Sequence, residues 1–180
     1  GKENGNMLEV KFYDTVDDAL LKFAVIISQS NGKWVMCKHK ERDTYEVPGG
    51  HREEGEDILD TAKRELQEET GAVKFDLEPL CVYSVTGKTN VNESGEESFG
   101  LLCFAEIMEF SDKLESEIEK VELMDELPEN WTYPLIQPKL IERYQQAEKQ
   151  SYIQIQQVAK QTIDYIKNII KPEMNLLEIR

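Results

Sequence analysis

A short segment of this chain holds five charged residues whose types and spacing could support chemistry. They lie within residues 50–72 and are Glu56, Arg64, Glu65, Glu68 and Glu69. Carboxylates three and four residues apart share one side of a helix and repel one another unless something positive neutralises them. A hard divalent cation such as Mg²⁺ binds carboxylate and carbonyl oxygens and is commonly shared with substrate phosphates. The spacing of the glutamates therefore favours a divalent metal site.

The elements around these residues would hold the carboxylates in position. Asp57 follows a turn-forming segment and suits a helix N-cap, so we expect a helix over residues 58–70 that ends at Gly71. Its apolar face would be formed by Ile58, Leu59, Ala62 and Leu66. The glutamates would lie along the edge of this face. Glu69 falls inside the apolar sector, where a carboxylate without a positive partner is costly.

Two glycines, Gly49 and Gly50, stand at the start of the segment. Glycine allows a backbone carbonyl to approach a ligand closely. The alternative to a metal site is a solvated acidic helix, in which Arg64 pairs with Glu68 four residues further on. The glycines and the upstream Glu56 favour the metal site over that alternative.

The full pattern resembles the Nudix box of the Nudix hydrolase family. Five residues separate Gly50 from Glu56, seven separate Glu56 from Arg64, and residues 64–72 read RELQEETGA. The resemblance implies an α+β fold, namely a Nudix-type α/β/α sandwich with a mixed sheet. It also implies metal-dependent hydrolysis, with Mg²⁺ as the expected cofactor and Mn²⁺ as an alternative.

Roles for individual residues follow from the same resemblance. Gly49 would supply a backbone carbonyl to the metal, and Glu65, Glu68 and Glu69 would complete the ligand set. Arg64 would brace the loop by pairing with a glutamate of the box. The general base is left open between two glutamates of the box, with Glu65 preferred to Glu56.

The composition describes an acidic chain with the core of a single domain. Its 180 residues include 21 Lys and Arg against 36 Asp and Glu, a formal net charge of −15, and 39% of the residues are hydrophobic. Such a charge disfavours binding to duplex nucleic acid, and it means that polyphosphates would need metal ions or local cations to approach. Three cysteines in apolar runs suggest neither a disulfide framework nor a zinc site. Without a signal-peptide pattern or an apolar run long enough to span a membrane, we expect a cytoplasmic protein.

The rest of the chain alternates between strand and helix patterns. Strand-like runs cover residues 21–28, 33–38, 45–47, 73–85, 99–108 and 121–127. The Asn-Gly step at 31–32 predicts a hairpin between the first two runs, and the nearly continuous apolar run at 99–108 suits a central strand. A helix is expected over 131–147. The box helix would cover one face of the sheet and this later helix the other.

The last part of the chain is expected to form a C-terminal helical extension. We assign residues 1–148 to the Nudix hydrolase domain, with a frayed polar segment at 1–6, and residues 149–180 to an amphipathic helix that stops at Pro172. Its apolar stripe is formed by Tyr152, Ile155, Ala159, Ile163, Ile166 and Ile170. The stripe would pack on its own domain or on a partner subunit, so a homodimer is one alternative.

Substrate contacts are expected from segments outside the box. Lys38, Lys40 and Arg42 form a cationic patch directly before the box and would stand near the phosphates, although surface cations of this kind are also ordinary. Asn130 would either offer its amide to a purine edge or cap the helix that follows. A polar loop at 87–98 offers three candidates for a further metal ligand, which are Glu93, Glu96 and Glu97.

The resemblance implies hydrolysis of a nucleoside diphosphate linked to another group. Gly87 and Thr89 occupy the positions where the ADP-ribose and dinucleoside polyphosphate subfamilies carry a proline and a tyrosine. The run from Lys40 through the box, and residues 125–130, resemble MutT-type 8-oxo-dGTP diphosphatases of the Bacillus kind. We therefore expect a small nucleotide substrate, a purine nucleoside triphosphate, cleaved to monophosphate and pyrophosphate. The alternatives are an ADP-ribose, dinucleoside polyphosphate or RNA 5′-end hydrolase, or a non-catalytic nucleotide-sensing module.

Overall fold

The computed structural model describes residues 8–90, 92–112 and 118–179, with only the backbone described at the start of the last strand and beyond residue 170. The segment 1–6, expected to fray, lies outside these residues. The chain forms two compact units, one up to Glu142 and one from Arg143 onward. Within the described residues, no helix combines the length and the apolar composition that a membrane crossing needs.

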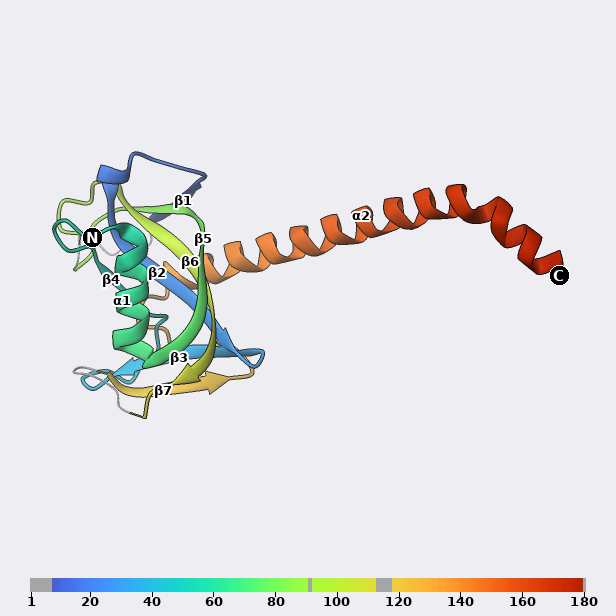
Figure 1. Cartoon of the computed structure of the whole chain (residues 1–180). Helices are drawn as coiled ribbons and strands as arrows, with labels where there is room; N and C mark the ends of the chain where they lie inside the picture. Colours follow the sequence, from blue (N-terminus) through green and yellow to red (C-terminus); the bar gives the residue numbers. More distant parts are fainter. Residues whose placement is uncertain (1–7, 91, 113–117, 180) are drawn as a thin grey trace. The chain divides into compact units, whose positions relative to one another are not determined.

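The first unit is built around one mixed sheet, with α1 lying against it (Figure 1). In chain order the elements are β1 (Glu9–Tyr13), η2 (Asp18–Leu20), β2 (Leu21–Ser30), β3 (Lys33–His39), β4 (Gly49–His51), α1 (Ile58–Thr70), β5 (Ala72–Thr86), β6 (Ser98–Phe110), β7 (Ile118–Met124) and α2 (Gln137–Ile179). The sheet order is β1-β5-β6-β2-β3-β7, and β4 pairs with β2. Strands β2 and β6 are parallel, and the other strand pairs are antiparallel. The predicted mixed sheet is confirmed, with β6 in its centre.

The predicted hairpin joins β2 to β3. Asn31 and Gly32 both adopt positive φ angles, 51° and 76°, which a two-residue turn of this kind requires. The ladder begins directly outside the turn, where Ser30 pairs with Lys33. The local Asn-Gly signal therefore fixes both the turn and the register of this pair.

Side chains on alternate faces of β2 enter different surroundings. Ala24 and Ile26 belong to the main hydrophobic core, together with Leu66 of α1. Phe23 and Val25 point to the opposite face, as the pleat requires, and line a cavity there. The sheet thus separates the core beneath α1 from this cavity.

The segment between β7 and α2 differs from the sequence prediction. The helix expected to begin at Trp131 begins instead at Gln137, and residues 132–136 form bends and turns. Pro138 explains the difference, because a proline inside a helix lacks its N–H donor and clashes with the preceding turn, whereas it is tolerated in the first turn. Residues 45–47, expected to form a strand, make isolated bridges, Glu46 with Cys37 and Tyr45 with Trp131.

The two helices expected at the C-terminal end are one helix. α2 continues through residues 145–150, whose Gln, Ala, Glu and Lys residues all have high helix propensity. It also continues through Pro172 to Ile179, and it bends towards its C-terminal end (Figure 1). The stop predicted at Pro172 is therefore wrong.

Candidate active site

Helix α1 places the glutamates of the box, and its ends are set locally. The Asp57 side chain accepts a hydrogen bond from the Leu59 backbone N–H at 2.9 Å, and Gly71 ends the helix with φ of 76°. Both bounds agree with the prediction. The helix buries Ile58, Ala62 and Leu66, so the glutamates on the neighbouring positions face the loop from Gly49 to Asp57.

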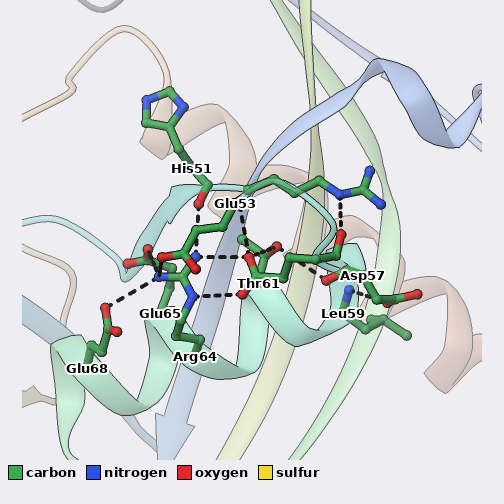
Figure 2. Close-up of polar contacts among 10 residues, drawn as sticks. His51, Glu53, Asp57, Leu59, Thr61, Arg64, Glu65 and Glu68 are labelled. Carbon is green, nitrogen blue, oxygen red and sulfur yellow. Dashed lines mark hydrogen bonds and ion pairs between the residues drawn. The ribbon is translucent and has the colours of Figure 1, made fainter.

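Arg64 joins that loop to the helix through several contacts (Figure 2). Its guanidinium donates to both carboxylate oxygens of Glu56, at 2.8 and 3.0 Å, and to the His51 carbonyl at 3.0 Å. It also donates to Glu65 at 2.7 Å and, at the longer distance of 3.5 Å, to Glu68. A bidentate pair of this kind fixes the relative position of the two groups. Arg64 therefore holds the loop of residues 49–57 against the face of α1 that carries Glu65 and Glu68.

The contacts of Glu56 make its carboxylate a weak base. Hydrogen bonds from Arg64, and then from the Thr61 hydroxyl at 2.6 Å, hold the pKa of Glu56 at about 2. Such bonds stabilise the ionised form, so the carboxylate has little tendency to take a proton near neutral pH. The position of Glu56 suits bracing of the loop.

Glu65 lies in a different environment, against the backbone of β4. A Cβ atom on Gly50 would overlap the Glu65 carboxylate, so only glycine leaves room for this carboxylate. Burial raises the pKa of Glu65 above its usual value, and the hydrogen bond from Arg64 opposes this effect. Of the two glutamates proposed as the base, Glu65 is the one that lines the cavity.

Glu69 is the most buried carboxylate of the box, with 8% of the residue exposed. One carboxylate oxygen accepts the Gly49 backbone N–H at 2.9 Å. Burial, and the nearby charges of Glu65 and Glu46, raise the pKa of Glu69 to about 8, although the Gly49 hydrogen bond lowers it. A cation beside these carboxylates would stabilise their ionised forms.

The carboxylates open into a cavity of about 470 Å³. Glu65, Glu68 and Glu69 line it beside Gly49 and Gly50. These donors are all oxygens, and the Gly50 position is shaped around one of them, so the site fits a hard divalent cation such as Mg²⁺. The same cavity has a largely apolar side formed by Phe23, Val25, Val47, Tyr83, Val85, Ile136 and Leu140.

The residues predicted to bind substrate separate into two groups. Arg42 lines the cavity, whereas Lys38, Lys40 and Asn130 are not among the described residues that line it. Asn130 neither caps a helix nor faces the cavity: its side chain donates to the Asp43 carbonyl at 2.6 Å. Its backbone carbonyl accepts from the Tyr45 N–H, so Asn130 holds the loop that carries Arg42.

The three glutamates of loop 87–98 are also absent from the described cavity lining, to which this loop contributes Thr89, Asn92 and Ser98. Glu97 instead accepts hydrogen bonds from the Tyr13 hydroxyl at 2.6 Å and the Ser84 hydroxyl at 2.7 Å. These partners hold the pKa of Glu97 below its usual value. Glu97 therefore ties the loop to β1 and β5.

The cavity also includes Tyr133, Gln137 and His39, which were not among the predicted site residues. Tyr133 lies in a segment expected to be helical, with the Arg42 guanidinium 6.0 Å from the centre of its ring. Gln137 accepts the Val47 N–H through its side-chain oxygen at 2.9 Å, which fixes the loop beside the box. His39, at the end of β3, faces Glu69. Pro134 and Pro138 were the available signal that this segment turns before it becomes helical.

Comparisons with known proteins agree with this geometry. Residues 20–144 match the family model described as the NUDIX domain. YtkD of Bacillus subtilis (strain 168), named as a proposed 8-oxo-dGTP diphosphatase, is 35% identical over 130 residues, which cover 69% of this chain and 75% of that protein.

Solved structures show the same fold. A mutant of the Bacillus subtilis pyrophosphohydrolase BsRppH matches with a TM-score of 0.63 and 26% identity, over 78% of this chain and 90% of that one. A NUDIX hydrolase from Nitrosomonas europaea matches with a TM-score of 0.57 and 22% identity, over 71% and 90% of the two chains. With Glu65, Glu68 and Glu69 of the box gathered at one cavity and the family model matching residues 20–144, the chain belongs to the Nudix hydrolase family and is an enzyme of that family.

Proposed function

We propose that this Nudix hydrolase is a MutT-type pyrophosphohydrolase that cleaves a purine nucleoside triphosphate to the monophosphate and pyrophosphate, with 8-oxo-dGTP as the leading candidate. The observation that carries the proposal is a single cavity that joins the glutamates of the box to Arg42 and Tyr133. The similarity to YtkD supports 8-oxo-dGTP, and the similarity to BsRppH supports pyrophosphohydrolase chemistry more generally.

The carboxylate side of the cavity would bind the diphosphate through a metal. Nudix hydrolases generally need a divalent ion such as Mg²⁺. Here Glu65, Glu68, Glu69 and the Gly49 carbonyl would hold it. The ion would neutralise charge on the diphosphate, which a chain of net charge −15 would otherwise repel.

Glu65 is our choice for the general base. Its pKa is raised by burial and it lines the cavity, whereas the pKa of Glu56 is about 2 because Arg64 and Thr61 bind its carboxylate. A carboxylate with so low a pKa takes up a proton poorly near neutral pH, which disfavours Glu56. Arg64, itself bonded to Glu56, would then hold the Glu65 carboxylate in position.

The apolar side of the cavity would bind the nucleobase of the substrate. The Tyr133 ring offers a flat apolar surface, and purines stack well on such surfaces. Arg42 lies over this ring and also pairs with Glu46 at 3.3 Å, so its guanidinium is held in place. The volume of about 470 Å³ falls within the usual range for small-molecule sites.

A substrate panel tests the proposal. We would compare kcat/KM for 8-oxo-dGTP, the ordinary dNTPs, 5′-triphosphorylated RNA, ADP-ribose and diadenosine polyphosphates. We expect a purine nucleoside triphosphate to lead and to release pyrophosphate. A clear preference for ADP-ribose or for RNA 5′ ends would reject the MutT-type assignment. Nucleotide binding without turnover of any member would favour a sensing module.

Matched variants test whether the nucleobase stacks on Tyr133. Tyr133→Ala should raise KM about fivefold or more, because stacking contributes about 1–3 kcal/mol per base. Lys40→Ala is the control, since Lys40 lies in the loop that carries Arg42 but is outside the described cavity lining. Equal effects of the two substitutions on KM would contradict stacking of the nucleobase on Tyr133.

A further inference from the structure

A second group of metal-binding side chains lies beside the glutamates of the box. His39 comes from the end of β3, Glu46 from the loop before β4, and Glu69 from α1. One ligand atom from each residue lies within 4.8 Å of the other two. Among the residues that the structure describes, one group of three or more His, Cys, Asp or Glu side chains is close enough to share an ion, and it is this group.

The distances of His39 from the two glutamates suit binding of a shared metal ion. His39 Nε2 is 3.4 Å from Glu69 Oε2 and 3.5 Å from Glu46 Oε2. Nitrogen and oxygen ligands lie about 2.0–2.2 Å from a bound transition metal. Two ligand atoms at that radius and at the observed separations subtend roughly 110° at the ion, close to a tetrahedral angle.

The environment of the group favours a cation. The side chains of Glu46 and Glu69 are about nine-tenths buried, with 9% and 11% exposed, and that of His39 is 22% exposed. Each carboxylate is already oriented by its other oxygen, Glu46 by Arg42 at 3.3 Å and Glu69 by the Gly49 N–H at 2.9 Å. Buried carboxylates held this close to one another are unfavourable unless a positive charge lies between them.

We propose that His39, Glu46 and Glu69 bind a second divalent ion, of the Mn²⁺, Co²⁺ or Zn²⁺ type, which shares Glu69 with the metal of the box. This inference rests on the metal-dependent function proposed above. The imidazole nitrogen decides the class of ion, because Mg²⁺ prefers oxygen ligands whereas imidazole suits transition metals. One carboxylate can serve both ions, since its two oxygens offer about four lone-pair positions.

The number of histidines allows a direct test. The chain has only two, His39 and His51, and both line the cavity. We would add Mn²⁺ to the tag-free wild-type protein and record the electron spin echo envelope modulation of the bound Mn²⁺, which detects a ¹⁴N nucleus coordinated to the ion. The proposal predicts a ¹⁴N coupling that His39→Ala removes and His51→Ala, the matched control, retains.

Isotope labelling identifies the coupled nitrogen as that of a histidine. Protein made with ¹⁵N-histidine should replace the ¹⁴N coupling with a ¹⁵N coupling, and retention of the ¹⁵N coupling in labelled His51→Ala assigns it to His39 even if His39→Ala does not fold. His39→Ala should also weaken one class of Mn²⁺ site by at least about tenfold, as even partners of metal ligands commonly contribute this much. Excess Mg²⁺ should leave the nitrogen-coupled Mn²⁺ largely in place.

The outcomes separate this inference from the function on which it rests. If Mn²⁺ binds and supports hydrolysis but shows no histidine coupling, the second site is rejected and the proposed function stands. His39 would then be an ion-pair partner of the two glutamates. A coupling that is lost in His51→Ala and kept in His39→Ala would also reject it. If no divalent ion binds, with or without nucleotide, both proposals fail.

Discussion

The helices α1 and α2 both carry apolar residues at three- and four-residue spacing, but they differ in what covers these residues. On α1, Ile58, Ala62 and Leu66 are buried in the core of the first unit. On α2, the large apolar side chains from Tyr152 to Ile169 are between 42% and 67% exposed. The difference shows that a periodic apolar stripe specifies a helix without specifying its partner.

The largest expected effect comes from removing a carboxylate of α1. Glu68→Gln or Glu69→Gln should reduce kcat at fixed Mg²⁺ by at least about 100-fold, the scale expected when a catalytic group is lost. Glu148→Gln removes the same charge from an exposed position of α2 and is the control. Full activity in excess EDTA would show that the metal site is not needed.

The second prediction compares one apolar residue from each helix. Leu66 has no exposed surface, so Leu66→Ala should lower the free energy of unfolding by about 2–5 kcal/mol. Ile163 is 52% exposed, and Ile163→Ala should change that free energy by less than about 0.5 kcal/mol in dilute solution. Urea unfolding at several protein concentrations measures both. A large, concentration-dependent effect at Ile163 would mean that α2 is covered in solution.

The third prediction concerns acid stability and the brace formed by Glu56. The pKa of Glu56 is about 2 in the folded protein and 4.5, its ordinary value, in the unfolded chain, so the unfolded chain takes up this proton first as the pH falls. The stabilisation is therefore complete above pH 4.5 and is lost as the pH falls towards about 2. Unfolding curves should show Glu56→Gln less stable than wild type near neutral pH, with a difference that shrinks below pH 4.5. A constant difference across this range would exclude the ionised brace.

The smallest effect on chemistry is expected from removing most of α2. A chain ending at Gln150 should keep metal-dependent kcat/KM within about tenfold, a change in activation free energy of about 1.4 kcal/mol or less. If the exposed face of α2 pairs two copies, sedimentation should show the mass falling from that of a dimer to that of a monomer. A truncated protein that is folded but inactive would show that α2 contributes to the site.

The parts of the molecule that sequence specifies locally were predictable. Helix α1 has its ends at the predicted residues because Asp57 and Gly71 satisfy the backbone groups there. The β2–β3 turn follows from Asn31 and Gly32 in the same way. The box could be read as a metal-binding pattern because its glutamates are separated by helical spacings.

The remaining features depend on contacts between distant segments. Tyr133 and His39 lie far apart in the sequence of the first unit, and no local pattern brings them to the glutamates. The raised pKa of Glu69 depends on burial and on the charges of Glu65 and Glu46, which only the folded chain places together. The sheet order is likewise a long-range property.

The parallel pairing of β2 with β6 has a consequence for how the protein is made. The β2–β3 hairpin is local and can form early. Ile26 of β2, in contrast, pairs with Cys103 of β6, which lies far along the chain, so this pairing forms later. Closing so long a loop costs entropy before its contacts form, so non-local parallel pairs fold slowly. Until β6 has been synthesised, the apolar edge of β2 is open to other chains. Temperature and the rate of synthesis should therefore govern the yield of soluble protein more than the final stability of the domain.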